Sequence, residues 1–379
     1  MARDRGQRFG IEEEYFIIDL RSRRLLAEPS AGVLAACREA IGEGFSYEMF
    51  QGQVEVASPV FDDAVYAATY LGRVRRELNQ ALAEHGLGFI SSGAHPMAGW
   101  QAQRATPQAH FQRLFDEFRI VAQRSVLSGL HVHAEIPTGV DRIAVMNEVL
   151  PWLPMLLALS VSSPLWQGQL SGYCSYRQVV CDEWPRMGIP EYLLDEPGFQ
   201  HYLGLLKRTG AVASDANIWW GCRPSLSYPT LELRMTDACP RLSDALALAG
   251  LFRVMVKHAC MLPVPGSQYS IECHWLLKEN RNQARRWGHQ GRFVLAPQTP
   301  ALSLEQWLTL AERRFGATAC ALGEEGVFAQ ARNILSDGTS AQRQSGWYEA
   351  SAAPAEERWQ AVVDGLAAES REGQIVLAS

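Results

Sequence analysis

Residues 10–20 read GIEEEYFIIDL, a stretch that combines the alternation of a β-strand with three consecutive glutamates. In a strand, alternate side chains share a face, so Glu12 and Glu14 point one way while Glu13 and Tyr15 point the other. The carboxylates of Glu12 and Glu14 are then about 7 Å apart, and at an effective dielectric near 20 they repel by roughly 2 kcal/mol. Either these acids are solvated at a frayed strand start, or a cation lies between them.

Three further predicted strands, near 52–58, 127–137 and 229–238, repeat this alternation of apolar and polar side chains. Such alternation predicts one face on the core and one open face, and it favours a mainly antiparallel α+β fold over a parallel α/β fold. Glu48 precedes Glu55 by seven residues and adds another carboxylate. The polar faces carry Gln53 and Glu55 in the first of these strands, His131, His133 and Glu135 in the second, and Glu232, Arg234 and Thr236 in the third.

The chemistry of these polar faces favours a metal site. If the strands are neighbours, five or six acids converge, and they cannot all stay ionised without cations. Oxygen-rich sites with an occasional imidazole suit Mg²⁺ or Mn²⁺. Zinc held by the two histidines of HVH and a glutamate is an alternative, although zinc sites more often use two or three His or Cys ligands. A plain solvated sheet surface is the other alternative, but such a surface would mix Lys, Thr, Arg and Ser.

The composition narrows the class of protein. The chain has 379 residues, of which 47% are hydrophobic and 20% charged, as in ordinary globular proteins. Its net charge of −6 gives no basic footprint for nucleic acid. The N-terminus lacks the apolar core of a signal peptide, and the apolar run 149–166 contains three prolines, which favours a buried helix over a membrane span. Eight cysteines without a CxxC pair indicate reduced thiols in the cytoplasm.

Helices are expected at about 30–41, 62–85, 107–124 and 141–161, and another after the strand that ends near 238. Asp62 is the predicted N-cap of the second helix, and Ser243 or Asp244 that of the last. From about 301 the chain reads helical to its end, interrupted by a loop at 333–344. We therefore expect a main domain over 1–300 and a helical C-terminal extension over 301–379, packed on the same domain.

Several nucleotide and nucleophile motifs are absent from the sequence. It has no Walker A motif and no GxGxxG that opens a helix after a strand, so a nucleotide would be held through metal and arginines. It also has no GxSxG motif for a nucleophilic serine. Arg177, Arg186 and Arg223 lie in aromatic-rich loops within the segment 165–229. These arginines either grip carboxylates or phosphates, or stack on aromatic rings.

Eight motifs occur along the chain in this order: GIEEEYFIID, SSGAHPMAGW, LSGLHVH, ALSVSSPLWQG, SYR, PRMGIP, IWWGCRPS and TLELRMTDACP. Together they resemble the glutamate–cysteine ligase type 2 family, the bacterial carboxylate–amine ligases. The resemblance covers about residues 9–290, and ARNILSDGTSAQRQ near 331–344 extends it. It implies a glutamine-synthetase-like fold, in which an antiparallel sheet forms a funnel with helices outside. It also implies ATP, magnesium, amino-acid and amine substrates and, as one option, a homodimer.

The resemblance assigns roles position by position. It implies catalytic roles for Arg234, Arg177 and Arg223, and cofactor contacts for Arg234, His131 and His133. The metal ligands that it implies are Glu12, Glu14, Glu48, Glu55, His131 and Glu232. The implied activity is an ATP-dependent ligase that forms an amide bond through an acyl phosphate. A metal-dependent hydrolase, or a nucleotide- or amino-acid-binding protein without turnover on the same fold, are the alternatives.

The chain departs from the family pattern at three places. Leu170, Ser171 and Gly172 stand where the family often has Asp-Thr-Gly, and Asn282 stands where Trp is usual. Gly221 and Cys222 stand in WWGCRPS, where Trp-Asp followed by an apolar residue is common. These positions are expected in loops that shape the acceptor pocket, so the identity of the amine, and whether glutamate is the acid, stay open.

Overall fold

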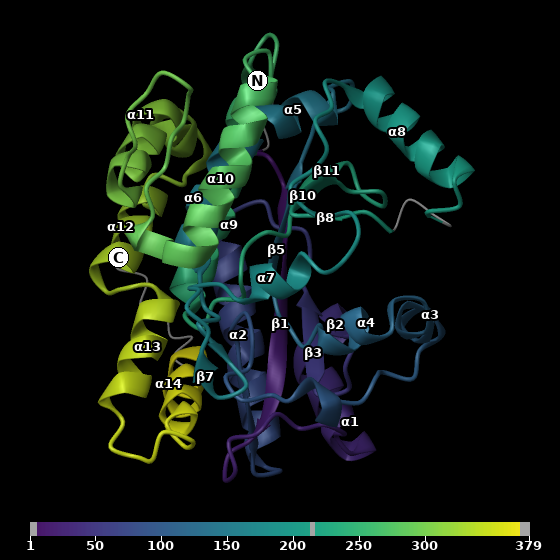
Figure 1. The fold of residues 1–379 in the computed structure, drawn as a ribbon, viewed down its shortest axis with the longest axis vertical. Coiled ribbons are helices and arrows are strands. Elements are labelled where there is room, and N and C mark those ends of the chain that lie inside the picture. The colour runs from purple at the N-terminus through teal and green to yellow at the C-terminus, as the bar shows by residue number, and fades with distance from the viewer. Residues whose placement is uncertain (1–5, 213–216, 372–379) are drawn as a thin grey trace.

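A central antiparallel sheet surrounded by helices dominates the computed structural model, which describes residues 6–212 and 217–371 (Figure 1). Its strands follow the order β10-β11-β5-β1-β3-β2, and β4 pairs with the end of β1. The strands are β1 (Phe9–Asp19), β2 (Phe45–Tyr47), β3 (Gln53–Ala57), β4 (Leu87–Ile90), β5 (Leu130–Glu135), β10 (Cys222–Pro224) and β11 (Thr230–Leu233). The predicted α+β fold with a mainly antiparallel sheet is therefore confirmed.

Two short ribbons lie apart from this sheet. They are β6 (Leu165–Trp166) with β7 (Gln169–Leu170), and β8 (Met187–Gly188) with β9 (Trp219–Trp220). The helices are α1 (Ala31–Ile41), α2 (Ala64–Ala83), α3 (Ala109–Phe118), α4 (Ile120–Arg124), α5 (Arg142–Val149), α6 (Leu153–Ser160), α7 (Arg177–Cys181), α8 (Glu196–Arg208), α9 (Leu242–Met261), α10 (Ile271–Trp287), α11 (Leu304–Leu322), α12 (Val327–Ser336), α13 (Ser340–Ala350) and α14 (Trp359–Arg371).

The two faces of the sheet meet different surroundings. Ile11 and Val132 face the main core, which the sheet forms with α2, α5, α6 and α9. On the opposite face of β1, Phe16 and Ile18 pack into a smaller cluster that includes Leu366 of α14. Fully burying such a side chain contributes about 1.5–3 kcal/mol, so a one-residue slip of register would expose the whole apolar set. The remaining length of that second face carries the polar residues.

The middle glutamate of the opening stretch lies in the core and not in the polar face. Glu13 is 1% exposed and forms a bidentate ion pair with Arg75 of α2, with Nε–Oε2 at 3.2 Å and Nη2–Oε1 at 2.5 Å. Arg75 also donates to the carbonyls of Cys239 and Pro240, and Tyr15 donates to Glu13. Because each partner is hydrogen-bonded, the buried charges are matched. Glu13 thereby ties β1 to α2 and to the start of α9.

Some predicted helix boundaries are wrong. Asp63, not Asp62, caps α2 by accepting from the Tyr66 N–H. Arg241 is the N-cap position of α9, so Ser243 and Asp244 lie inside its first turn. The predicted helix 107–124 breaks at Arg119, whose φ is +46°.

The apolar segment 141–161 is divided and buried. A 3₁₀ turn over Leu150–Trp152 separates α5 from α6, because proline lacks the N–H that a continuous helix needs. Residues Arg142–Ser160 are long and apolar enough to cross a membrane, but 78% of that window is buried inside the protein. The expectation of a buried helix is confirmed here.

The C-terminal helices pack on the rest of the chain. α11 and α12 contact α9, and α14 contacts β4 and α2. The loop predicted at 333–344 is only three residues long in the structure, because α12 continues to Ser336 and a capping box of Thr339 and Gln342 starts α13. All eight cysteines are free thiols.

Candidate active site

The register of the sheet brings the polar faces of four strands together. β11, β5, β1 and β3 are consecutive neighbours. Glu12 pairs with His131, Glu14 pairs with Glu55, and Glu232 pairs with His133. Directly opposite side chains in an antiparallel pair have Cβ atoms about 5 Å apart. The predicted ligands from β1, β3, β5 and β11 therefore share one face.

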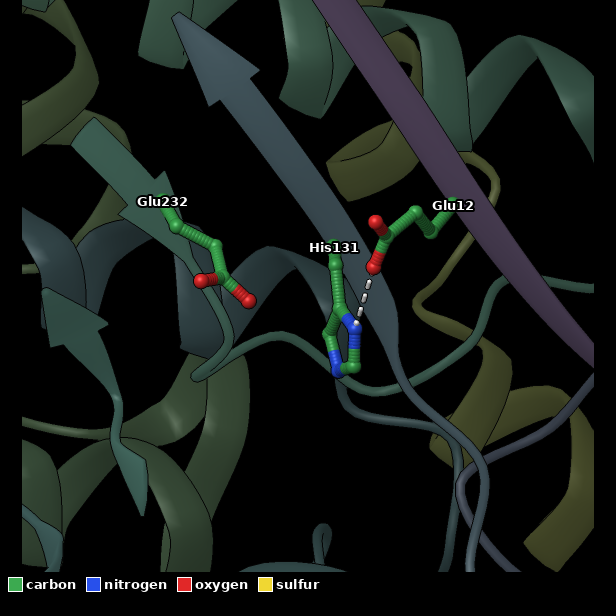
Figure 2. A group of neighbouring side chains, drawn as sticks. All are labelled: Glu12, His131 and Glu232. Carbon is green, nitrogen blue, oxygen red and sulfur yellow. Dashed lines mark hydrogen bonds and ion pairs between the residues drawn. The ribbon is translucent and has the colours of Figure 1, made fainter. Parts of the chain in front are cut away.

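Glu12, His131 and Glu232 form the first ligand group, which Figure 2 shows on β1, β5 and β11. Their ligand atoms lie within 4.8 Å of one another. His131 places Nδ1 3.2 Å from Glu12 and Nε2 3.5 Å from Glu14. His133 lies beside this group, with Nε2 3.3 Å from Glu12 and Nδ1 3.0 Å from the Thr230 hydroxyl. The ring of His133 therefore contacts a ligand residue from outside the group.

Glu14, Glu48 and Glu55 form the second ligand group, again with ligand atoms within 4.8 Å of one another. Burial raises the pKa of Glu48 to about 7, with the charge of Glu14 adding to the rise. Burial and the Glu48 charge raise the pKa of Glu55 well above its usual range. Burial also raises the pKa of Glu14, although Arg177 and the Gly129 N–H oppose the rise. Three carboxyls so close together favour a divalent cation as their counter-charge.

In the first ligand group the pKa values are lowered and not raised. Burial lowers the pKa of His131 to about 4, and the Arg234 charge adds to this, so the imidazole is neutral at pH 7. Burial disfavours ionised Glu232, but Arg234 and Arg223 outweigh it and hold its pKa at about 2. Burial likewise opposes ionisation of Glu12, but hydrogen bonds from His131 and His133 lower its pKa. The group thus offers two carboxylates and a neutral imidazole, the forms that bind metal.

The donor chemistry of both groups fits Mg²⁺ or Mn²⁺. Of the six ligand atoms, five are carboxylate oxygens and one is an imidazole nitrogen, which suits hard divalent cations. Zinc sites commonly use more nitrogen or sulfur than this.

The predicted arginines occupy different places. Arg234 donates to Glu232 over 2.5 Å and lines the same cavity as Glu14 and Glu48. Arg223 donates to Glu232 at 2.7 and 3.3 Å but does not line that cavity. Arg186 donates to the Asn217 carbonyl and lies over the Trp219 ring at 5.8 Å, which is the stacking alternative.

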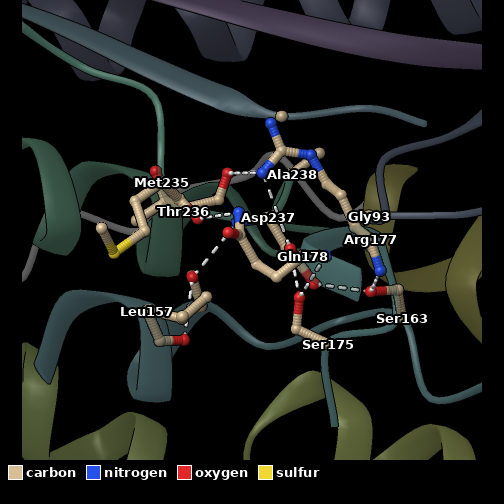
Figure 3. Close-up of polar contacts among 12 residues, drawn as sticks. Gly93, Leu157, Ser163, Ser175, Arg177, Gln178, Met235, Thr236, Asp237 and Ala238 are labelled. Atoms are coloured by element: carbon tan, nitrogen blue, oxygen red, sulfur yellow. Dashed lines mark hydrogen bonds and ion pairs between the residues drawn. The ribbon is translucent and has the colours of Figure 1, made fainter. Parts of the chain in front are cut away.

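A buried hydrogen-bond network that includes Asp237 holds Arg177 in place (Figure 3). Asp237 is fully buried and accepts from the Ser162 N–H at 3.0 Å and from the hydroxyls of Ser163 and Ser175, both at 2.8 Å. Ser163 in turn accepts from the Arg177 N–H at 3.1 Å. The Arg177 guanidinium donates to the carbonyls of Thr236 and Arg234.

Two glycines leave room for this network. A Cβ at Gly93 would lie 2.6 Å from the Asp237 carboxylate, and a Cβ at Gly129 would collide with the Arg177 guanidinium. Sequence reasoning missed Asp237, Ser163, Ser175 and Gly93 as parts of the site. The available signal was their position inside the motifs SSGAHP, SVSSP, SYR and TDACP.

A cavity of about 250 Å³ opens beside the acids. Glu12, Glu14, Glu48, Glu55 and His131 line one side of it, together with Arg177 and Arg234. Six apolar side chains also line it and are here called the apolar wall: Phe111, Leu114, Leu127, Trp184, Met187 and Trp219. Sequence reasoning did not single out any of these residues.

Leu170, Gly221, Cys222 and Asn282, which depart from the family pattern, are not among the residues that line this cavity. Leu170 and Asn282 are exposed, and neither lines it. Gly221 and Cys222 are buried and pack elsewhere, with Gly221 against Met235. Trp219, two residues before Gly221, does line the cavity, so the place of these positions in loops that shape the acceptor pocket stays a prediction.

Comparison with known proteins shows the family of this chain. A family model described as glutamate-cysteine ligase family 2 (GCS2) matches residues 8–365. The chain belongs to glutamate–cysteine ligase family 2. A relative from Pseudomonas fluorescens strain Pf-5 is 62% identical over 97% of this chain and 96% of its own length, and one from Pseudomonas entomophila is 48% identical over 89% and 88%. Both carry the name glutamate–cysteine ligase 2 provisionally.

Solved structures place this member of glutamate–cysteine ligase family 2 among glutamine-synthetase-like ligases by fold. A bifunctional glutathione synthetase from Pasteurella multocida matches with a TM-score of 0.70 at 14% identity, covering 96% of this chain and 53% of that enzyme. This chain therefore spans about half the length of that enzyme. A glutamate–cysteine ligase from Francisella tularensis, solved in complex with AMP, matches with a TM-score of 0.67 at 11% identity, covering 98% and 93%.

Proposed function

We propose that this protein is an ATP-dependent carbon–nitrogen ligase that joins a carboxylate to an amine through an acyl phosphate, as a glutamate–cysteine ligase does. The observation that carries the proposal is the pair of adjoining ligand groups, Glu12/His131/Glu232 and Glu14/Glu48/Glu55, with Arg177 and Arg234 at the same cavity. Such a site suits phosphoryl transfer, which depends on positioning and on neutralising charge. Membership of the family supports the same reaction.

The reaction has two steps. A carboxylate oxygen of the acid substrate attacks the γ-phosphorus of ATP, and the bond from that phosphorus to the bridging oxygen breaks as ADP leaves with the electron pair. The neutral amine then attacks the carbonyl carbon of the acyl phosphate. A C–N bond forms, the C–O bond to phosphate breaks, and inorganic phosphate leaves with that electron pair. The proton released from the amine nitrogen passes to phosphate or solvent.

The residues of the chain divide this work. Mg²⁺ or Mn²⁺, when bound by the two ligand groups, would neutralise phosphate charge during transfer. Arg234 is proposed to steady the γ-phosphoryl group, since its guanidinium lies between Glu232 and the cavity. Arg177 is proposed to grip the acid substrate, and Arg223 to hold Glu232 in place. His131 and His133 are proposed to orient Glu12 beside the nucleotide phosphates.

A zinc hydrolase is the weaker candidate, because carboxylates predominate over imidazoles in both ligand groups. A binding protein without turnover would keep the same geometry, and only an assay separates it from a ligase. We also propose a cytoplasmic location, which the free thiols support.

The test is a coupled ADP-release assay with ATP, Mg²⁺, an amino acid and a screen of amines. We expect ADP only when both the acid and an amine are present, and none after chelation of the metal. Glu232→Gln is expected to lower kcat/KM by about 100-fold or more, because it removes a charged ligand. Glu135→Gln is the matched control: it changes another carboxylate on the same face of the sheet, but one paired with Arg8 outside the ligand groups. ADP release that needs neither acid nor amine, or equal loss in both variants, would refute the proposal.

A further inference from the structure

The apolar wall faces the same cavity as the second ligand group, so it contacts whatever reacts there. Trp184 and Trp219 cross with ring centroids 5.2 Å apart, and Phe118 packs against both rings at 4.8 and 5.7 Å. Leu114 and Met187 extend the wall, while Phe111 and Trp184 are largely buried within it. A rigid aromatic surface of this kind favours an apolar or aromatic group of a ligand.

Two polar groups beside the wall, the Trp184 indole N–H and the Ser125 hydroxyl, are already paired. The Trp184 indole N–H donates to the Ser125 hydroxyl at 2.6 Å, and that hydroxyl donates to the Val121 carbonyl at 2.9 Å. A thiol with its amino-acid carboxylate would therefore meet few partners on the wall. Burying an unpaired carboxylate against apolar groups is strongly unfavourable.

Positive charge is also scarce around the cavity. Among the described residues that line it, only Arg177 and Arg234 are cationic, against Glu12, Glu14, Glu48 and Glu55. Under the proposed function, Arg234 serves the phosphoryl group and Arg177 serves the acid substrate. No lining arginine within the described parts of the chain is then left for a carboxylate on the acceptor.

Three residues of the site do not share the cavity with the apolar wall. Arg223, His133 and Glu232 are not part of the cavity lining. They belong to β10, β5 and β11, and β10 ends the strand order of the main sheet.

We infer that the acceptor is a primary amine that carries an apolar or aromatic group and no carboxylate next to its nitrogen, and that the apolar wall binds this group. The inference rests on the proposed ligase function and names the substrate class of the same site. Phe111, Leu114, Trp184, Met187 and Trp219 are its specificity-determining residues. Cysteine, with a small side chain and a carboxylate, is then a poor acceptor.

The test measures binding and turnover separately. Calorimetry with the full chain, Mg²⁺ and a non-hydrolysable ATP analogue compares phenethylamine with ethylamine, phenylalanine and cysteine. Phenethylamine is expected to bind about tenfold or more tightly than each of the others, because only it combines the ring with an uncharged flank. ADP release with glutamate as the acid then gives kcat/KM for the same four amines, with the same order expected.

Variants assign the effect to the wall. Trp219→Ala is expected to reduce phenethylamine binding about tenfold and to leave the KM for ATP unchanged, whereas Trp219→Phe keeps most of the binding. Trp275→Ala removes a tryptophan that is 61% exposed on α10 and should change neither quantity. Circular dichroism and thermal unfolding confirm that each variant is folded.

Two results would overturn the inference while leaving the ligase proposal intact. One is ADP release with cysteine or phenylalanine preferred over phenethylamine. The other is a Trp219→Ala variant whose KM for ATP rises while its amine binding is unchanged, which would make the wall a base site. Conversely, ring-dependent binding without ADP release from any amine would support the wall as an amine site and refute the ligase.

Discussion

Asp237 holds neighbouring side chains and backbone in place and would not itself contact a substrate. Its carboxylate accepts hydrogen bonds from Ser162, Ser163 and Ser175, and Ser163 accepts from the backbone N–H of Arg177. The backbone of Arg177 is thereby fixed, and its side chain lines the cavity. A side chain that positions a charged group in this way affects reaction geometry more than binding of the ground state.

Asp237→Asn is expected to lower kcat by about 10- to 100-fold with a smaller change in KM, because an amide N–H would face a serine hydroxyl or the Ser162 N–H and let Arg177 shift. Steady-state ADP release measures both constants. Asp244→Asn is the control, since Asp244 is another buried acid, in α9 and away from the cavity. An Asp237→Asn variant that is destabilised but keeps its kcat would show that the network serves stability alone.

His95 makes the stability of the fold depend on pH. Its ring is 2% exposed, its Nε2–H donates to the Arg23 carbonyl, and its Nδ1 accepts from the Met97 N–H, both at 3.1 Å. Burial lowers the pKa of His95 to about 4, and the nearby Arg24 charge adds to this. The unfolded chain, with a pKa near 6.5, binds the proton more readily. The contribution is thus complete above about pH 6.5 and is lost as the pH falls toward 4.

When the pH falls from 7.5 to 5, protonation of His95 in the unfolded chain is expected to lower the free energy of unfolding by about 2 kcal/mol. Urea unfolding of the wild type and of His95→Gln at both pH values isolates the effect, because the other titrating groups are common to the two proteins. The variant is expected to lose about 2 kcal/mol less than the wild type over this range. Parallel losses in the two proteins would contradict the assignment.

At the scale of elements, the alternation of polar and apolar residues predicted the strands of the site well. Local sequence signals, such as candidate cap residues, predicted the helix ends less well. Glu12, Glu55, His131 and Glu232 lie on the predicted polar faces because period 2 follows directly from strand geometry. Helix caps were less predictable, since two candidate cap residues often stand next to each other, as Asp62 and Asp63 do. The breaks at Arg119 and Leu150–Trp152 depend on tertiary packing or on a single proline.

One buried ion pair links strand β1 to helix α2. Glu13→Gln would leave the Arg75 guanidinium, which is fully buried, without its counter-charge, so we expect a loss of about 3–5 kcal/mol in unfolding free energy. Adding Arg75→Met is expected to recover part of this loss. Glu77→Gln is the control, because Glu77 pairs with Arg73 at the surface of the same helix and is worth about 0.5 kcal/mol or less. Equal losses for Glu13→Gln and Glu77→Gln in urea unfolding would contradict this account.

At the scale of the whole molecule, the strand order was the part that sequence could not supply. Alternation shows which side chains share a face of one strand, but not that β11, β5, β1 and β3 are neighbours. The family resemblance provided the expected fold, and the structure gives the pairing. The apolar wall escaped prediction for a related reason: Phe111 comes from α3, Trp184 from a loop and Trp219 from β9, and no periodicity links them.

The central claim is that acids from β1, β3 and β11, together with Glu48 and with His131 of β5, form a site that divalent cations neutralise. Crystals grown with Mn²⁺ and an ATP analogue test it most directly through anomalous diffraction at the manganese edge. The account predicts one anomalous peak bounded by Glu12, His131 and Glu232, and another bounded by Glu14, Glu48 and Glu55. A nucleotide bound in the crystal with no manganese peak at either group would contradict it.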